Sequence, residues 1–245
     1  MHFLLSAKYY PYSEEKITKV YINCKQIINL RITNYYSMKT HIDILPREVT
    51  NDKFSVFGCG YRNKDGVAVL AAKPNQSQDI AYIGNYIRSD RAQWATNTLR
   101  SMLTTATKDE LGDFKKLYFE TATFNGIFSY RSARNLVTRS PFLVLDIDDL
   151  ESTDEARYVQ SQLVGDPAVE TALCFVSPKG QGVKWVVRLP EWAQSPDFKT
   201  TFQKLQQYVG FEYGIAVDKS GSDVCRACFL PYDKDCFINP KYQHV

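Results

Sequence analysis

Two acidic residues at the end of an apolar run are the residues of this sequence best suited to chemistry. Asp146 and Asp148 follow the run Phe142–Leu145 and stand two positions apart. Residues two apart on a β-strand project from the same face, so these carboxylates repel each other unless a cation lies between them. Oxygen ligands of this kind suit Mg²⁺ or Mn²⁺. The pair predicts a divalent metal site, and the simpler alternative is two solvated acids at a strand end.

A glycine-rich segment, Ser177-Pro-Lys-Gly-Gln-Gly-Val-Lys184, offers groups that suit phosphate. Gly180 and Gly182 allow the backbone to approach a ligand closely, and Lys179 and Lys184 bring positive charge. The alternative is an ordinary hairpin turn with solvated lysines. The expected position of this loop beside the acidic strand favours phosphate contact.

The segment Val217–Arg226 contains a third candidate carboxylate. Asp218 would complete a three-carboxylate metal site, and Arg226 would reach a phosphate or a base. Asp223 is a rival for the same role, because its orientation depends on the glycine turn between the two acids. The sequence leaves this choice open.

The elements that must position these residues follow one another in a recognisable order after Pro141. Apolar patterns and turn residues predict strands at Phe142–Asp148, Thr171–Ser177 and Val183–Leu189, a helix capped by Ser152 or Thr153, a second helix opening at Ser195 and Pro196, and strand material at Ile215–Asp218 and Val224–Leu230. This order predicts an α+β fold with a split βαβ core of the ferredoxin or RRM-like kind. In that topology the first and third strands are neighbours and the last strand flanks the first. The candidate acids, Lys184 and Arg226 would then share one sheet face.

The chain before this core divides less clearly. The turn-prone stretch Lys73–Gln78 is the expected boundary between an N-terminal segment, residues 1–76, and a core, residues 77–245, whose RRM-like part covers about residues 141–232. The pattern between Asp79 and Lys116 is typical of helices. No role is assigned to residues 1–76.

The composition is that of a folded globular chain, with 44% hydrophobic and 23% charged residues among 245. Thirty basic and 27 acidic residues give a net charge of +3, so any basic surface must be local. The N-terminus lacks a basic start, and no apolar run reaches the roughly 18 residues of a membrane span. We therefore expect a cytoplasmic protein without membrane partners.

Three of the six cysteines suggest a competing metal site. Cys225, Cys228, Cys236 and His244 approach a zinc-binding spacing. If Val224–Leu230 is a strand, however, Cys225 and Cys228 point to opposite faces, which disfavours zinc. Reduced thiols are the simplest account of these residues in a chain of this size.

Taken together and in order, the motifs resemble those of the archaeo-eukaryotic primase superfamily. The likeness is closest to the primase-like N-terminal domains of multidomain mobile-element and phage replication proteins, and it covers about residues 80 to 245. The segments that carry it are Gly126-Ile-Phe-Ser-Tyr-Arg131, Leu145-Asp-Ile-Asp-Asp-Leu150, Phe175-Val-Ser-Pro-Lys-Gly-Gln-Gly-Val-Lys184, Asp223-Val-Cys-Arg-Ala-Cys-Phe-Leu-Pro-Tyr-Asp233 and Ile238-Asn-Pro240.

The resemblance implies a metal-dependent primase or DNA polymerase that uses NTP or dNTP on a single-stranded DNA template, with a helicase-type ATPase as a partner in cis or in trans. Asp146, Asp148 and Asp218 match the metal-binding acids, and Ser177 with Lys184 matches the motif that contacts the phosphates of the incoming nucleotide. Many members carry His at the position of Lys184. Arg226 and Asn239 match positions near the third motif, with roles in nucleotide or template contact.

One other function remains as an alternative, and two more are disfavoured by the sequence. A catalytically inactive nucleic-acid-binding module of the same fold would serve replication or mobilisation without chemistry. A nucleotide cyclase lacks support because its Gly-Gly-Asp-Glu-Phe-like turn is absent from the sequence. A rolling-circle nicking protein needs a His-x-His pair, and the three histidines are His2, His41 and His244.

Overall fold

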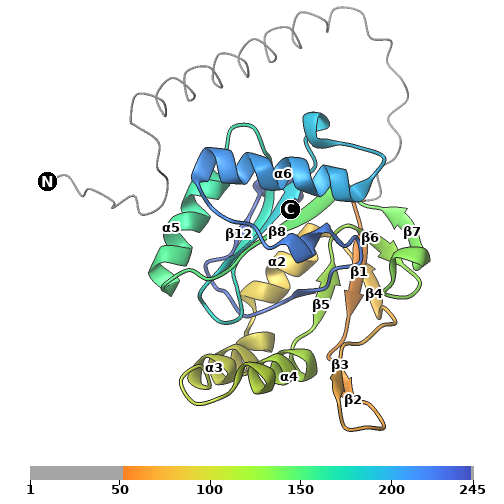
Figure 1. Cartoon of the computed structure of the whole chain (residues 1–245), viewed down its shortest axis with the longest axis vertical. Coiled ribbons are helices and arrows are strands. Elements are labelled where there is room, and N and C mark those ends of the chain that lie inside the picture. Colours follow the sequence, from red (N-terminus) through yellow and green to blue (C-terminus); the bar gives the residue numbers. More distant parts are fainter. Residues whose placement is uncertain (1–51, 244–245) are drawn as a thin grey trace, which may run out of the picture. The chain divides into compact units, whose positions relative to one another are not determined.

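The computed structural model describes residues 52–243, which belong to the second of the two units into which the chain divides, Met1–Glu48 and Val49–Val245. All of the structure described below belongs to the second unit (Figure 1). This unit is an α+β structure in which the described residues form five α-helices and several small antiparallel sheets, as the sequence predicts.

The central sheet runs in the order β12–β9–β10–β8. Its strands are β8 (Phe142–Ile147), β9 (Thr171–Val176), β10 (Val183–Arg188) and β12 (Phe237–Ile238). Strand β10 is antiparallel to both of its neighbours, and its register places Lys184 opposite Asp146. The two residues singled out from the sequence therefore lie side by side on adjacent strands.

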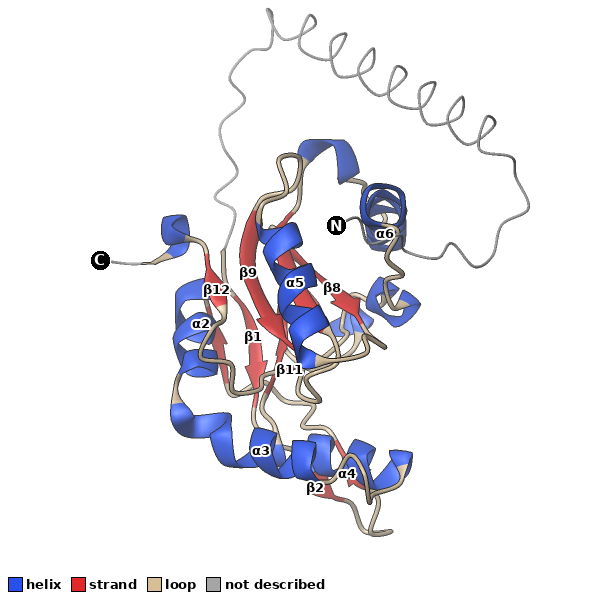
Figure 2. Ribbon diagram, turned by 90° about the vertical axis from the view of Figure 1, so that its left-hand side faces the viewer, coloured by secondary structure: helices blue, strands red, loops and turns tan. Residues whose placement is uncertain are grey.

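Both faces of the central sheet are covered, which explains why β8 and β9 read as nearly continuous apolar runs. On one face, Leu145 packs in a core with residues of α5 (Thr153–Val164) and α6 (Phe198–Tyr213). On the other face, Val144 packs in a second core with residues of α2 (Ile80–Arg88). Figure 2 shows α5 and α6 separated from α2 by the strands of this sheet.

A second sheet corrects the expected domain boundary. Its order is β11–β5–β1–β4, formed by β11 (Cys228–Phe229), β5 (Thr121–Thr123), β1 (Phe54–Phe57) and β4 (Gln76–Gln78). Strand β1 pairs with β4 and also with β5, so strands on both sides of residue 76 share one sheet. The structure accordingly divides the chain between Glu48 and Val49 and not at residue 76.

Two short antiparallel ribbons complete the strand inventory of the described residues. One joins β2 (Tyr61–Arg62) to β3 (Ala68–Val69), and the other joins β6 (Gly126–Phe128) to β7 (Leu136–Arg139).

The helical pattern between Asp79 and Lys116 is confirmed as α2 followed by α3 (Gln93–Ser101) and α4 (Lys108–Tyr118). Helix α4 begins with a capping box, in which Thr107 accepts from the amide of Glu110 and the Glu110 side chain accepts from the amide of Thr107. This local arrangement fixes where α4 begins and hence which residues of its first turns face the loop after β9.

The two predicted helices of the core are also confirmed, with one shift. Ser152 caps α5 as expected. Helix α6 begins after Asp197, whose side chain accepts from the amides that follow it, and not at Ser195. The helix continues through Gly210 and ends at Gly214, whose φ of 67° is a conformation that glycine adopts without strain.

The predicted fourth strand beside β8 is not formed. Within Val224–Leu230 only β11 is a strand, and it joins the second sheet through β5. Of Ile215–Asp218, one backbone hydrogen bond reaches β8, from the amide of Asp218 to the carbonyl oxygen of Asp146 at 2.8 Å. The chain then turns into the 3-10 helix Lys219–Ser222, because the Asp218 side chain accepts from the Ser220 amide and competes with further strand pairing.

None of the helices in residues 52–243 has the length and apolar character needed to cross a bilayer.

Candidate metal centre

Three carboxylates from distant parts of the sequence meet at the end of β8. One carboxylate oxygen from each of Asp146, Asp148 and Asp218 lies within 4.8 Å of the other two. Asp146 lies on the face of β8 that also carries Val144, Asp148 directly follows the strand, and the Asp218–Asp146 backbone hydrogen bond brings the third acid beside them. All the donors are hard oxygen ligands, so this group could hold a divalent metal ion. The structure selects Asp218 over its rival Asp223.

Lys184 projects from β10 into this group of acids. Its ammonium group forms an ion pair with Asp146 and lies 3.7 Å from the Asp148 carboxylate. Burial by itself would lower the pKa of Lys184, but the charges of Asp146 and Asp148 outweigh it and raise that pKa. Lys184 therefore stays protonated inside the site.

Asp146 is the most enclosed of the three acids, with a side chain 19% exposed against 48% for Asp148. Burial raises the pKa of Asp146, and the charges of Asp148 and Asp218 raise it further against the opposing effect of Lys184. The site thus contains more negative charge than Lys184 alone neutralises.

Asp218 is held in place by its own turn. Its carboxylate accepts hydrogen bonds from the amide and the hydroxyl of Ser220 and lies 3.5 Å from the guanidinium of Arg226. Burial would raise the pKa of Asp218, but these hydrogen bonds and the charge of Arg226 lower it below the ordinary value. These contacts therefore hold the Asp218 carboxylate in place and favour its ionised form.

The loop between β9 and β10 closes over the end of β8. Ser177 accepts from the amide of Gly180 and donates its own amide to Gly182, at 2.9 and 2.8 Å. Gly180 has a φ of 85°, and a Cβ atom at Gly182 would overlap the carbonyl oxygen of Ile147. Both glycines are required by this backbone path, which keeps the loop packed against the acidic strand.

Asp149, directly after the acids, has a positive φ of 60°. The left-handed region is uncommon for residues other than glycine, although Asp and Asn tolerate it best. The next amide, that of Leu150, donates to the carbonyl oxygen of Gln181. This bend carries the chain from β8 across the glycine loop and leaves the Asp148 side chain close to Asp146 and Asp218.

Arg100 is a positioning residue that the sequence did not identify. It lies on α3, and its guanidinium donates to the carbonyl oxygens of Pro178 and Ser177 at 3.2 and 3.5 Å. Burial lowers the pKa of Arg100. More than 70 residues separate Arg100 from the loop in the sequence, so no local pattern indicates this contact.

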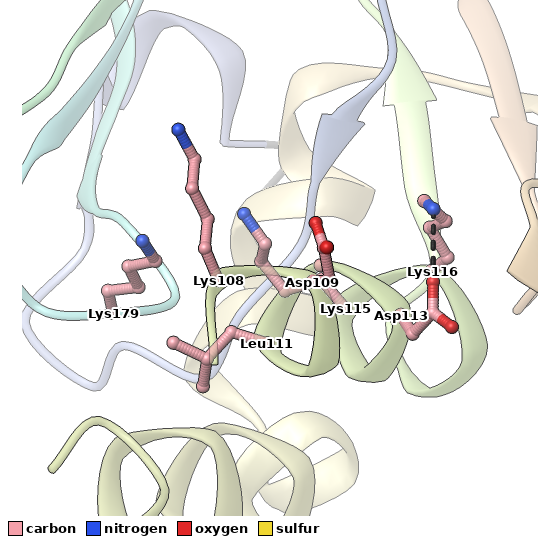
Figure 3. Close-up of a pocket in the computed structure, with 8 residues that line it drawn as sticks. Lys108, Asp109, Leu111, Asp113, Lys115, Lys116 and Lys179 are labelled. Atoms are coloured by element: carbon pink, nitrogen blue, oxygen red, sulfur yellow. Dashed lines mark hydrogen bonds and ion pairs between the residues drawn. The ribbon is translucent and has the colours of Figure 1, made fainter. Parts of the chain in front are cut away.

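Lys179 leads from the loop to a hollow along α4, which the sequence also did not predict. The hollow has a volume of about 340 Å³. Figure 3 shows the eight residues that line it, namely Lys108, Asp109, Leu111, Gly112, Asp113, Lys115, Lys116 and Lys179. A basic surface therefore adjoins the loop of the acidic site.

Three of the other candidates have different roles. Asp223 closes a local turn by accepting from the amide of Cys225 at 3.1 Å. Arg226 is half-exposed and pairs with Asp218, so it belongs to the rim of the site. Asn239 donates to the carbonyl oxygen of Thr171 and accepts from the amide of Lys241, which are structural contacts at the edge of β9.

The zinc alternative has no support in the described residues. The acidic group is the one cluster of metal-ligating side chains found there, and Cys225, Cys228 and Cys236 do not form another. His244 lies outside the described residues.

Comparison with known proteins gives one family and no closer relative. Neither a curated protein nor a solved structure matches the chain. The model of the family described as "BT4734-like, N-terminal domain" matches residues 114–237, just over half of the chain, and this range includes all three acids and the glycine loop. The chain belongs to the BT4734-like, N-terminal domain family.

Proposed function

We propose that this protein is a metal-dependent nucleotidyltransferase of the primase-polymerase kind, which extends a primer or a DNA strand on a single-stranded template. The observation that carries the proposal is the convergence of Asp146, Asp148 and Asp218, of which one carboxylate oxygen each lies within 4.8 Å of the others. The ordered motifs of the sequence give this acidic group its connection to nucleotide chemistry.

The arrangement of the core supports the same proposal. Strand β8, helix α5, the β9–β10 hairpin and helix α6 follow one another, with β10 between β8 and β9. We interpret this as a split βαβ core of the RRM-like kind, in which the short contact of Asp218 with β8 replaces the fourth strand.

In this proposal Asp146, Asp148 and Asp218 hold Mg²⁺ or Mn²⁺. A bound divalent ion supplies charge neutralisation at the substrate phosphates and activation of the attacking 3′-hydroxyl. The protein's own part is to position the NTP or dNTP: the Ser177–Gly182 loop offers backbone groups, and Lys179 and Lys184 place positive charge where phosphate charge develops. Arg226 contacts a phosphate or the template at the rim. A helicase-type ATPase is the proposed partner.

A second candidate function is favoured by one specific contact. The ammonium of Lys184 already pairs with Asp146 and approaches Asp148, so it supplies part of the positive charge that a metal ion would bring. In a protein that had lost metal chemistry, these contacts of Lys184 would still neutralise the acids and preserve the fold. The alternative is a catalytically inactive module that binds nucleic acid in a replication or mobilisation complex.

The test is incorporation of labelled nucleotides by the full chain on a primed or unprimed single-stranded DNA template, with Mg²⁺ or Mn²⁺ and with ribo- or deoxynucleotides. The variant is the double change Asp146→Asn and Asp148→Asn. The matched control is Asp149→Asn, which removes a neighbouring negative charge. Asn tolerates the positive φ of this position, so the backbone is expected to stay unchanged.

We expect the wild type and the control to incorporate nucleotides in a metal-dependent way. We expect no incorporation by the double variant. Template binding without incorporation under either metal would instead support the inactive module. Neither binding nor incorporation would contradict both candidates.

A further inference from the structure

The hollow along α4 is basic because most of its lysines lack an acidic partner. Of its two aspartates, Asp113 is already paired, with Lys116 at 3.1 Å and Arg62 at 3.5 Å. Within residues 52–243, Lys108, Lys115 and Lys179 have no carboxylate within ion-pair distance. Three unpaired ammonium groups therefore face one remaining acid, Asp109.

Helical spacing brings the two α4 lysines together. Lys108, Gly112 and Lys115 are four and three residues apart, so they share one face of the helix. Gly112 has no side chain to fill the space between them, and a Cβ atom there would meet nothing within 4 Å. In Figure 3 the side chains of Lys108, Lys115 and Lys179 extend to the same side of α4, whereas Lys116 lies apart against Asp113.

Lys115 lies in an environment that disfavours its positive charge. It is half-buried, and its ammonium lies 5.5 Å from the centre of the Phe229 ring. Burial lowers the pKa of Lys115, and the positive charges of Lys179 and Lys184 lower it further. A negatively charged ligand in the hollow would relieve this repulsion.

The hollow adjoins the acidic group. Lys179 belongs to the loop that closes over β8, and Lys115 is close enough to feel the charges of Asp146 and Asp148 as well as that of Lys184. Lys179 is thus common to the hollow and to the loop that packs against the acidic strand.

We propose that the hollow along α4 is a phosphate-binding subsite, in which Lys108, Lys115 and Lys179 hold phosphate groups of the ligand whose reacting end lies at Asp146, Asp148 and Asp218. The inference rests on the proposed function for the identity of that ligand. The phosphates come either from the oligophosphate tail of a nucleotide or from the backbone of a nucleic-acid strand, and both present the same chemistry to the lysines.

The test uses the full chain, without divalent metal, and two probes. Inorganic tripolyphosphate represents the nucleotide tail, and its binding is measured by calorimetry. A fluorescent single-stranded oligodeoxynucleotide with a 5′-hydroxyl end represents the strand backbone, and its binding is measured by anisotropy. The variant is Lys108→Gln with Lys115→Gln. The control, Lys64→Gln with Lys199→Gln, removes the same charge at two exposed lysines outside the hollow.

Because the variant loses two charge-assisted contacts, its affinity for one of the probes is expected to fall at least about tenfold, with little change in the affinity of the control. Selective loss of tripolyphosphate assigns the subsite to a nucleotide tail, and selective loss of the oligonucleotide assigns it to the strand. Equal weakening in variant and control, or binding of neither probe by the wild type, would overturn the inference.

Failure of the proposed function is distinguishable from failure of this inference. A chain that incorporates no nucleotide but loses phosphate binding in the Lys108 and Lys115 variant keeps the subsite and loses the activity. A chain that incorporates nucleotide while variant and control bind both probes equally keeps the activity and loses the subsite.

Discussion

Lys184 determines the electrostatic balance of the acidic group more than any other single residue. It is buried, lies opposite Asp146 in the sheet register and reaches both Asp146 and Asp148. In the absence of metal it stabilises two carboxylates that would otherwise repel each other. When a metal ion binds, the same positive charge opposes it.

Replacing Lys184 with Met is therefore expected to have two opposite effects. The apo protein loses about 3 kcal/mol of stability, because Asp146 is left enclosed without its partner. Mn²⁺ binding becomes at least about fivefold tighter, because a positive charge at a few ångströms is removed. Urea denaturation without metal and Mn²⁺ titration measure the two effects, and unchanged Mn²⁺ affinity would show that Lys184 does not share a site with the metal.

Gly182 is the second residue whose replacement has a clear expected outcome. A Cβ atom there would overlap the Ile147 carbonyl oxygen, so Gly182→Ala is expected to cost about 2 kcal/mol and to displace the loop. Gly112→Ala on α4 is the control, because its Cβ is unobstructed and alanine favours a helix by about 0.5–1 kcal/mol. Thermal unfolding of the two variants checks this, and equal stabilities would contradict the packing argument.

At the scale of elements, the sequence predicts best where one physical signal dominates. Strands β8 and β9 are covered on both faces and are nearly continuous apolar runs, and Ser152 caps α5 by the side-chain contact expected of it. The prediction of a fourth strand beside β8 was wrong, because the Asp218 side chain accepts a hydrogen bond from the amide of Ser220 and the chain turns away from β8. Local competition of this kind is not visible in an apolar pattern.

The candidate site was predicted in part, for the same physical reason. Asp146, Asp148 and Lys184 lie on paired strands whose periodicity fixes their faces, so the sequence brings them together. The choice between Asp218 and Asp223 depends on a turn, and only the structure makes it. Arg100 and the α4 lysines lie beside the Ser177–Gly182 loop through tertiary packing, although more than 60 residues of sequence separate them from it, which leaves no local signal.

The end of β9 is held by a buried ion pair that supports the glycine loop. Asp233 is 3% exposed, and its carboxylate accepts a hydrogen bond of 2.8 Å from the amide of Val176. Both terminal nitrogens of the Arg157 guanidinium also donate to it. Because Val176 directly precedes Ser177, this contact fixes where the loop begins. It connects the segment after β11 to the element that carries Lys179.

Replacing Asp233 with Asn is expected to lower the free energy of unfolding by about 3 kcal/mol, because Arg157 loses a largely buried partner. Asp235→Asn is the matched control, since Asp235 lies 3.6 Å from the same arginine but is 58% exposed, and its loss should change stability by less than about 1 kcal/mol. Chemical denaturation distinguishes the two. Similar losses in both variants would show that burial of Asp233 is not the source of the stability.

At the scale of the whole described unit, the central sheet separates two apolar cores and leaves its edge strand β8 to carry the acids. A fully paired strand on that edge would cover the place where Asp218 approaches Asp146. The short contact that replaces it, together with the glycine loop, leaves part of the site accessible, with Asp148 and Arg226 about half-exposed.

The proposed activity requires that Asp146, Asp148 and Asp218 form a divalent metal centre. The most direct measurement is Mn²⁺ titration of the full chain, followed by electron paramagnetic resonance of free and bound ion, for the wild type, for Asp146→Asn with Asp148→Asn, and for Asp149→Asn. We expect the wild type and Asp149→Asn to bind Mn²⁺ that Mg²⁺ displaces, and we expect the Mn²⁺ affinity of the double variant to be at least about tenfold lower. Binding that is absent from the wild type, or that persists undiminished in the double variant, would contradict the proposed metal centre.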